Sequence, residues 1–504
     1  MNILGISAGF HDASITVVNE ETGKIIFAGH SERYSGKKND ELLCPELLNE
    51  VELDSISKVA YYEDPVSKQM RQCYAGQGIE WNKITLRSTL KQIGLPLYSR
   101  NKLCPVGKNV KFEKHQHHKS HAAAGFQTSP YQDATVVVVD AIGEWDSATI
   151  WRAEYDDNGY AKYTKLWSQK YPHSLGLFYS AFTQRVGLKP LEEEFIFMGM
   201  AAWGENKWFD KIYNDFILDP AELKFKQNLH VGIDPLYLDG ALDVDIAASV
   251  QSITEHLIDR LINKAKHLNS SPNLVFMGGV ALNCVANANI GAHYDNIWVM
   301  PNPGDAGSSL GAAALTYGKK LQWEGPFLGY GIYGLYPVND IIDELLENQI
   351  AGVATGRAEF GPRALGHRSL LADPRGNDIK DRVNDIKKRQ RFRPFAPMIL
   401  EEMAEEYFDM PNGWHKSPYM QTVAHCKKPK EFPAIIHIDG TSRVQTIGKE
   451  PEFAGVRELL EKWFVLTGCP MLLNTSLNIR GEPMVNSRWD ADRFEDQYGI
   501  KVLS

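Results

Sequence analysis

The chain has 504 residues, of which 43% are hydrophobic and 11% aromatic, and its formal net charge is −9. A chain of this length and composition is expected to form two or three globular domains. The acidic balance argues against a general nucleic-acid or membrane-surface binder, because both need an extended basic face, but it leaves room for a local basic pocket.

The N-terminus and the cysteines indicate the cellular compartment. Residues 1–10 lack a basic region followed by a long apolar run, so no signal peptide is predicted. No stretch reaches the roughly 18 apolar residues that a transmembrane helix needs. The cysteines form no CxxC pair, which favours reduced thiols in a cytoplasmic protein over a disulfide framework or a zinc ribbon. They are Cys44, Cys73, Cys104, Cys284, Cys426 and Cys469.

Two segments of the chain read alike, ILGISAGFHDASITVV at residues 3–18 and TVVVVDAIGEWDSATIW at residues 135–151. Each has an apolar run, a short turn of small and acidic residues, and a second apolar run, as a β-hairpin requires. A hairpin that recurs in this way predicts a duplicated α/β unit, although two unrelated hairpins would give the same pattern.

Between the hairpins, EKHQHHKSHAAAG at residues 113–125 contains four histidines. The run SHAAAGF favours a helix, on which His117 and His121 lie on one face and can chelate one metal. Asp140, which ends the apolar run TVVVVD, and Asp305, in the loop NPGDAGSS, could complete an N2O2 set for iron, manganese or zinc. The alternatives are a histidine pair that binds no metal and aspartates that only cap helices or turns.

Two later segments, residues 272–290 and 296–318, each combine a buried strand, a Gly-containing turn and the start of a helix. Gly278, Gly279 and Gly304 would let a backbone approach a ligand closely, and the helix N-termini would offer N–H groups to an anion. Most such turns are only turns, so the pattern alone does not require a phosphate site.

Residues 321–340 are rich in Gly, Pro and aromatics and are predicted to link to a second domain, which begins with an amphipathic helix at 339–349. Between residues 357 and 393 the chain becomes rich in Arg and Lys. In FRPFAP, residues 392–397, Pro and Phe hold Arg393 in a rigid frame, where a buried guanidinium would need an anionic partner. The planar fork suits a phosphate or a carboxylate, whereas a solvated basic face is the alternative.

Seven strings, in order along the chain, resemble the NodU/CmcH-type carbamoyltransferase family, which includes antibiotic O-carbamoyltransferases such as the tobramycin enzyme TobZ. The resemblance runs over nearly the whole chain and is most specific at residues 359–375 and 472–485. The strings are HHKSHAAAGF, VVVVDAIGEWDSATIW, FMGGVALNC, NPGDAGSSLGAA, RAEFGPRALGHRSLLADPR, RFRPFAP and LLNTSLNIRGEPMV.

The resemblance implies a fold and a two-step reaction. Residues 1–325 would form an actin/Hsp70-like (ASKHA, Kae1-like) duplicated domain, and residues 326–504 a YrdC-like α/β domain. In the YrdC-like domain, carbamoyl phosphate and ATP would give carbamoyladenylate and pyrophosphate. The carbamoyl group would then pass to an acceptor hydroxyl in the Kae1-like domain. The implied cofactors are ATP with Mg²⁺, and Fe(II) or another divalent metal.

The resemblance also implies which residues form the sites. The metal ligands would bind phosphate oxygens of the adenylate and neutralise charge as the carbamoyl group leaves; they are His117, His121, Asp140 and Asp305. The nucleotide-binding residues are Gly278, Gly279, Asn283 and Arg363. The residues of the carbamoyl phosphate pocket are Lys387, Arg393, Arg443, Asn474 and Ser476.

Activation of the acceptor hydroxyl is expected in the first hairpin turn. Asp12 could orient or deprotonate the hydroxyl, and His11 is the other candidate base. The alternative is that Asp12 only forms the turn of its own hairpin. Three positions depart from the family pattern: Gly36 and Asn39 stand where many members have Arg and His, and Leu477 stands where Phe is common.

The departures at Gly36 and Asn39 leave the acceptor open among antibiotics, sugars and modified nucleotides. A homodimer is a further expectation. The alternatives are a threonylcarbamoyl-type tRNA modification enzyme, against which the acidic net charge argues, and an inactive nucleotide-binding regulator.

Overall fold

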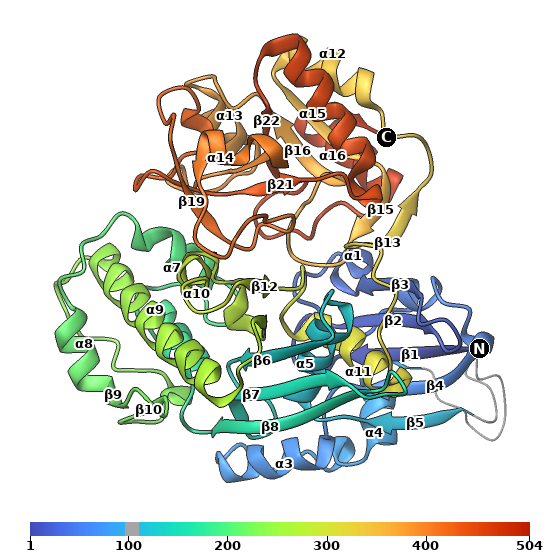
Figure 1. Ribbon diagram of the computed structural model, residues 1–504, viewed down its shortest axis with the longest axis vertical. Coiled ribbons are helices and arrows are strands. Elements are labelled where there is room, and N and C mark those ends of the chain that lie inside the picture. Colours follow the sequence, from blue (N-terminus) through green and yellow to red (C-terminus); the bar gives the residue numbers. More distant parts are fainter. Residues whose placement is uncertain (96–109) are drawn as a thin grey trace.

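The computed structural model describes residues 1–95 and 110–504. We call residues 1–325 the N-terminal half and residues 326–504 the C-terminal half; Figure 1 shows the second stacked on the first. Cys104 lies outside the described residues, and the five described cysteines are free thiols. Within the described ranges, no helix combines the length and the apolar character that membrane crossing requires.

The first sheet is built around the N-terminal hairpin. Strand β1 (Asn2–Ser7) pairs antiparallel with β2 (Ser14–Asn19), which pairs antiparallel with β3 (Ile25–His30). On its other side β1 pairs parallel with β4 (Ile56–Tyr61), which pairs parallel with β5 (Lys111–Lys114). The strand order is therefore β3-β2-β1-β4-β5.

The second sheet repeats this arrangement. Strands β6 (Asp133–Val139), β7 (Asp146–Tyr155) and β8 (Ala161–Lys170) are antiparallel neighbours. On the other side of β6, β11 (Asn273–Met277) and β12 (Asn296–Trp298) follow in parallel. The order β8-β7-β6-β11-β12 and its strand directions match those of the first sheet. The two hairpins thus belong to a duplicated α/β unit, as their pattern predicted.

Two helices rich in small residues lie between the sheets and contact each other, namely α5 (His117–Thr128) and α11 (Ser308–Tyr317). Glycines allow this close packing. A Cβ added to Gly125 would lie 2.5 Å from the Val275 side chain, and one added to Gly311 would lie 1.8 Å from the backbone oxygen of Ser120. This packing buries His117 and His121 at the start of α5.

The described residues of the N-terminal half form further helices besides α5 and α11. They are α1 (Glu32–Ser35), α2 (Pro45–Leu48), α3 (Pro65–Tyr74), α4 (Leu86–Gln92), α6 (Leu175–Arg185), α7 (Glu194–Ala201), α8 (Phe209–Phe216), α9 (Asp243–Leu268) and α10 (Cys284–Ile290). A small two-stranded sheet joins β9 (Ile217–Asp219) and β10 (Lys224–Phe225). Short 3-10 turns at Gly279–Leu282 and Asp305–Gly307 precede α10 and α11.

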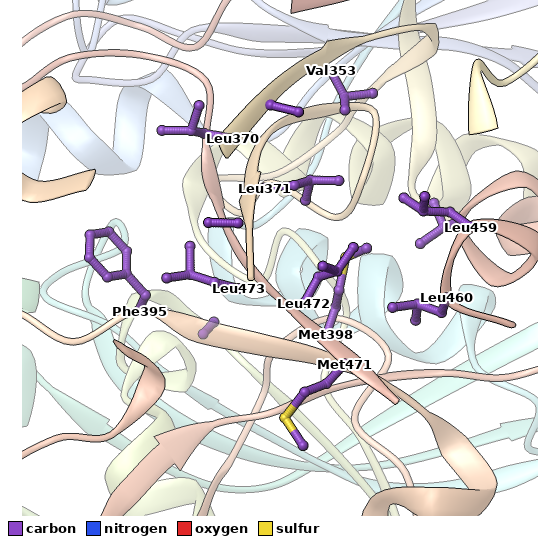
Figure 2. Packing of buried hydrophobic residues seen from close by; sticks show 14 of the residues in the cluster. Val353, Leu370, Leu371, Phe395, Met398, Leu459, Leu460, Met471, Leu472 and Leu473 are labelled. Carbon is purple, nitrogen blue, oxygen red and sulfur yellow. The ribbon is translucent and has the colours of Figure 1, made fainter. Parts of the chain in front are cut away.

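The C-terminal half has a six-stranded sheet of order β21-β17-β22-β16-β14-β23. Figure 2 shows its core, in which Leu371, Met398 and Leu472 from three of these strands pack near Leu459 and Leu460 of a covering helix. The strands are β14 (Ile350–Ala354), β16 (Arg368–Ala372), β17 (Ala396–Leu400), β21 (Gln445–Ile447), β22 (Met471–Ser476) and β23 (Val502–Leu503). The helices are α12 (Val338–Asn348), α13 (Ile379–Ile386), α14 (Ala404–Tyr407), α15 (Ala454–Thr467) and α16 (Arg488–Tyr498). A three-stranded sheet joins β18 (Phe408–Asp409), β19 (Val423–Cys426) and β20 (Thr441–Arg443).

The prediction of a linker over residues 321–340 is wrong in part, because it contains a strand. Strand β13 (Phe327–Ile332) pairs with β15 (Gly356–Glu359) and packs beside β3 of the N-terminal half. A Cβ on Gly329 would lie 3.1 Å from the Ala358 backbone oxygen. The glycines therefore permit close strand packing here, and the division at 325/326 stays a prediction.

Candidate functional site

A cavity of about 460 Å³ lies between the two halves. All the residues predicted to form sites line it except His117, His121 and Gly278. They are His11, Asp12, Asp140, Gly279, Asn283, Asp305, Arg363, Lys387, Arg393, Arg443, Asn474 and Ser476. The site residues that were predicted separately for the two halves therefore line one cavity.

At one end of the cavity lies the His/Asp cluster, His117, His121, Asp140 and Asp305. The Nε2 atoms of the two histidines are 3.1 Å apart, and each is 3.1 Å from Oδ2 of Asp140. Oδ1 of Asp305 lies 3.3 Å from Nε2 of His117 and 3.2 Å from that of His121. The four side chains come from the start of α5, the end of β6 and the turn before α11, and all are buried.

The His/Asp cluster fits a divalent transition metal. Ligand atoms that share an ion at 2.0–2.2 Å lie roughly 3 Å from one another, as these do, and two imidazoles with two carboxylates suit iron, manganese or zinc. The outer nitrogen of His121 has a partner in the Ser308 hydroxyl at 3.1 Å. That of His117 faces Oε2 of Glu63 at 3.9 Å. Such outer partners orient the ligating rings.

The electrostatics of the cluster reflect this crowding of opposite charges. Burial by itself would lower the pKa of His117 and of His121, but the carboxylates of Asp140 and Asp305 outweigh it and raise both pKa values. Burial would raise the pKa of each carboxyl, yet the two histidines hold both pKa values below the usual range. His118 lies outside the cluster, and its Nδ1 contacts the Thr149 hydroxyl at 3.0 Å.

The predicted acceptor-activating residues lie beside this cluster. Nδ1 of His11 is 3.0 Å from Oδ2 of Asp12, and Nε2 of His11 is 3.7 Å from Oδ2 of Asp305. Asp12 has φ 52°, so it does form a left-handed turn, but its carboxylate also lines the cavity. Burial opposes a charged His11, whereas the hydrogen bond with Asp12 and the charge of Asp305 raise the pKa of His11 to about 9.

The glycine turn between β11 and α10 differs in detail from the prediction. Gly278, at φ +91°, packs against β6, where an added Cβ would lie 2.2 Å from the Val139 oxygen, so it serves the fold. Gly279 faces the cavity. Asn283 also lines the cavity, but its Oδ1 caps α10 through the Ala286 N–H at 3.0 Å, and its Nδ2 donates to Gln251 at 3.0 Å. Its amide is thus engaged within the protein as well as lining the cavity, and its nucleotide-binding role stays a prediction.

The other end of the cavity carries the basic cluster, Arg363, Lys387, Arg389, Arg393 and Arg443. Within the described residues, no carboxylate lies within 4.0 Å of any of them, and the guanidinium groups of Arg363, Arg393 and Arg443 make no hydrogen bond to the protein. Burial and the mutual repulsion of the cations lower the pKa of Arg363 to about 9 and that of Arg393 to about 10. Such a cluster is electrostatically complementary to an anion.

The remaining residues of the predicted carbamoyl phosphate pocket frame this cluster. The ammonium of Lys387 is fixed to the end of β22, where it donates to the backbone oxygen of Ser476 and to Oδ1 of Asn478 at 3.0 Å. Asn474, two residues earlier, donates to Gln445 at 2.8 Å, while its own Oδ1 is buried and unpartnered. Lys387 therefore reaches the cavity already anchored.

The basic run contains structural arginines as well. The guanidinium of Arg368 is fully buried and donates only to backbone oxygens, those of Tyr330, Thr355, Gly356, His367 and Asn486. Arg375 and Arg391 form surface ion pairs with Asp373 and Asp385. The solvated-face interpretation thus holds for part of the run and fails for the residues that line the cavity.

The departures from the family pattern fall into three environments. Gly36 ends α1 in the left-handed conformation, at φ 70°. Asn39 lines the cavity, and its place beside the acceptor stays a prediction. Leu477 is buried in the core of the C-terminal half.

Sequence reasoning missed two contributors to the cavity wall. Arg389 stood in the basic run without an assigned role, although it lines the cavity beside Arg393. Phe195 and its neighbours on α7 gave no signal, because an aromatic residue on a short helix usually indicates only a core.

The chain is similar to known proteins over most of its length. The model of the carbamoyltransferase N-terminus matches residues 2–314 and that of the carbamoyltransferase C-terminus matches residues 342–504. An uncharacterized protein of Synechocystis is 32% identical over 98% of this chain and 94% of its own length. Nodulation protein NolO of Bradyrhizobium diazoefficiens is 32% identical over 74% of this chain and 75% of its own. Component A of the Acidaminococcus fermentans (R)-2-hydroxyglutaryl-CoA dehydratase, a solved structure, is 14% identical over 63% of this chain and 98% of its own, with a TM-score of 0.35.

Proposed function

Because the chain belongs to the carbamoyltransferase family, we propose that it is an ATP-dependent O-carbamoyltransferase that forms carbamoyladenylate and transfers its carbamoyl group to a hydroxyl. The N-terminal half would be the actin/Hsp70-like (Kae1-like) transfer domain, which the matching strand order of its two sheets supports. The C-terminal half would be the YrdC-like domain that forms the adenylate.

One observation carries the proposal: a single cavity joins the His/Asp cluster to the basic cluster, whose cations pair with no carboxylate among the described residues. The basic cluster suits the phosphate groups of carbamoyl phosphate and ATP, because its cations otherwise repel one another without compensation. An intermediate formed at the basic end would reach the other end without leaving the protein. The chemistry of the two ends thus matches the two steps of the reaction.

The first step replaces the bond between the carbamoyl group and phosphate with a bond between the carbamoyl group and AMP. Water releases phosphate from carbamoyl phosphate, and an oxygen of the resulting carbamate bonds to the α-phosphorus of ATP, which enters with Mg²⁺, while pyrophosphate leaves. Arg393 and Arg443 would hold the phosphate of carbamoyl phosphate until it leaves, and Arg363 would contact the nucleotide. Preorganised cations of this kind stabilise charge that develops in the transition state.

In the second step the acceptor oxygen bonds to the carbamoyl carbon, the bond to AMP breaks, and the hydroxyl proton passes to the His11–Asp12 pair. The hydrogen bond of 3.0 Å between these side chains would orient the accepting group. A divalent ion held by His117, His121, Asp140 and Asp305 would supply a Lewis acid toward phosphate oxygens, with Fe(II) the expected ion.

The acceptor is proposed to be a hydroxyl of a small molecule or a nucleotide, among antibiotics, sugars and modified nucleotides. A threonylcarbamoyl-type tRNA modification is less well supported, because the net charge of −9 gives no extended basic surface for RNA. An inactive regulator would have no need for both clusters. The cytoplasmic location and the homodimer remain predictions from the sequence.

Pyrophosphate release tests the proposal without knowledge of the acceptor. The purified protein is incubated anaerobically with iron(II), Mg²⁺ and ATP, with and without carbamoyl phosphate. We expect release that depends on carbamoyl phosphate. Release that is the same without it, or absent in both, would contradict adenylate formation by this chain.

A further inference from the structure

The basic cluster of the C-terminal half is covered by a segment of the N-terminal half. Leu191, Phe195 and Met198, from α7 and the turn before it, line the same cavity as the basic cluster. This segment contacts the other half: the Phe195 ring lies 4.8 Å from Cζ of Arg393, and Glu193 pairs with Arg480 at 3.1 Å.

The ring of Phe195 contacts the Arg393 guanidinium, and the charge of the Glu193 carboxylate also acts on it. Within the described part of the chain, this guanidinium has no hydrogen bond to the protein and no carboxylate within 4.0 Å. Arg389 offers the contrast. Its guanidinium donates to Asn384 at 2.7 Å and to the Pro394 oxygen at 3.1 Å, and it stacks on Phe395 at 4.1 Å. Arg389 is therefore held by its own half, whereas Arg393 depends on the other half.

Phe195 is itself well placed for this task, because α7 is firmly anchored. Its neighbours Ile196 and Phe197 are buried in the N-terminal half. The Glu194 carboxylate accepts hydrogen bonds from the Ser180 hydroxyl at 2.6 Å and from the Leu191 N–H at 2.5 Å, which fixes the start of the helix. The Phe195 ring, 40% exposed, is thus presented from a rigid element toward the cavity.

We propose that Phe195 is a positioning residue for the anion site: its ring covers one face of the Arg393 guanidinium, restricts its rotamers, and leaves its N–H edge for a phosphate. Aromatic faces attract guanidinium groups, and an arginine ordered in advance loses less conformational freedom when the anion binds. This assignment rests on the proposed function, because it takes the basic cluster to be a phosphate site. It adds that the site of the C-terminal half is completed by the N-terminal half.

The test measures inorganic phosphate binding by calorimetry in the full chain for Phe195→Leu, Phe195→Tyr and Trp203→Leu. Trp203 is a matched control, because it follows α7, is 46% exposed, and contacts Phe392 and His437 of the C-terminal half without touching a cation of the cavity. Phe195→Leu should weaken phosphate binding by roughly three- to tenfold. Phe195→Tyr should restore it, and Trp203→Leu should leave it unchanged.

Activity provides a second readout that a general loss of packing would not mimic. In Phe195→Leu the KM for carbamoyl phosphate should rise by a similar factor while kcat changes little, since the ring acts on the anion site alone. Phosphate binding by Phe195→Leu as tight as that of the unmodified protein, or an equal loss in Trp203→Leu, would overturn the assignment. Failure of the unmodified protein to bind phosphate would overturn the phosphate site itself, and with it both the assignment and the proposed use of the basic cluster.

Discussion

The His/Asp cluster and the basic cluster lie in one cavity but differ in how their charges are balanced. In the His/Asp cluster each of the four side chains contacts others of opposite character at 3.1–3.3 Å, so charge is compensated within the protein. In the basic cluster Arg363, Arg393 and Arg443 line the cavity without a carboxylate within 4.0 Å, among the residues described.

This difference shows how the fold forms one site for a metal ion and another for an anion. A metal ion needs ligand atoms already gathered at short distances, and histidines with aspartates can be gathered because they attract each other. An anion needs cations, which repel each other and must be held in place by the surrounding fold. We therefore expect substitutions at the two ends to have separable consequences.

The largest expected effect is that of Arg393→Ala on the first step. Loss of a preorganised charge partner should slow carbamoyl phosphate-dependent pyrophosphate release at least roughly a hundredfold, while metal content stays unchanged. Arg375→Ala is the matched control, because Arg375 belongs to the same basic run but pairs with Asp373 on the surface. A normal rate in Arg393→Ala, or equal losses in both variants, would remove Arg393 from the site.

The next effect concerns the other end of the cavity. His117→Ala and His121→Ala should each weaken metal binding by more than the roughly 10- to 100-fold that loss of an outer-shell partner costs. Metal content after anaerobic reconstitution with iron(II) measures this, and phosphate binding should be unaffected. His115→Gln, outside the cluster and bonded to Thr316 at 2.9 Å, should retain the metal. Retention of metal in all three variants would show that the cluster is not the metal site.

Anion binding should stabilise the fold by a smaller amount. Inorganic phosphate at about 100 times its Kd should add about 2.7 kcal/mol to the free energy of unfolding, if it binds only the folded state. Thermal denaturation with and without phosphate measures this shift, which added salt should reduce. Arg443→Ala should show a smaller shift than the unmodified protein. An undiminished shift in this variant would place the bound anion elsewhere.

The smallest effect is expected for the stability of Arg363→Met. No hydrogen bond to the protein is lost and a repulsion is relieved, so the free energy of unfolding should change by no more than about 0.5 kcal/mol. Arg368→Met should instead cost at least about 3 kcal/mol, because its buried backbone acceptors lose their donor. Urea denaturation of both variants measures the difference. Similar free energies of unfolding for the two variants would contradict the conclusion that Arg368 stabilises the fold and Arg363 does not.

Local patterns predicted much of this molecule. The two hairpins, the helix at His117 and the helix at 339–349 follow from short-range periodicity and turn chemistry, and the structure confirms them. The i, i+4 spacing placed His117 and His121 on one face because helix geometry is the same in every protein. By contrast, the glycines of residues 321–340 indicated a linker where they permit a strand to pack closely.

Residue type alone did not show which arginines of the basic run line the cavity and which stabilise the fold. Arg363 and Arg368 stand five residues apart in one motif, yet one lines the cavity and the other is buried among backbone oxygens. Their roles depend on what other segments supply around them. The same holds for Asn283, whose amide is engaged by Gln251 of α9, and for Phe195, whose partner Arg393 belongs to the other half.

The sequence by itself thus predicted the two hairpins, the histidine pair and the basic run, because each depends on neighbours a few residues away. Only the tertiary structure decided that Asp140 and Asp305 meet His117 and His121 within 3.3 Å, and that the basic cluster shares their cavity. These contacts depend on the packing of α5 and α11 between two sheets and of one half on the other. Such packing sums many small apolar contacts between distant segments, which no local pattern records.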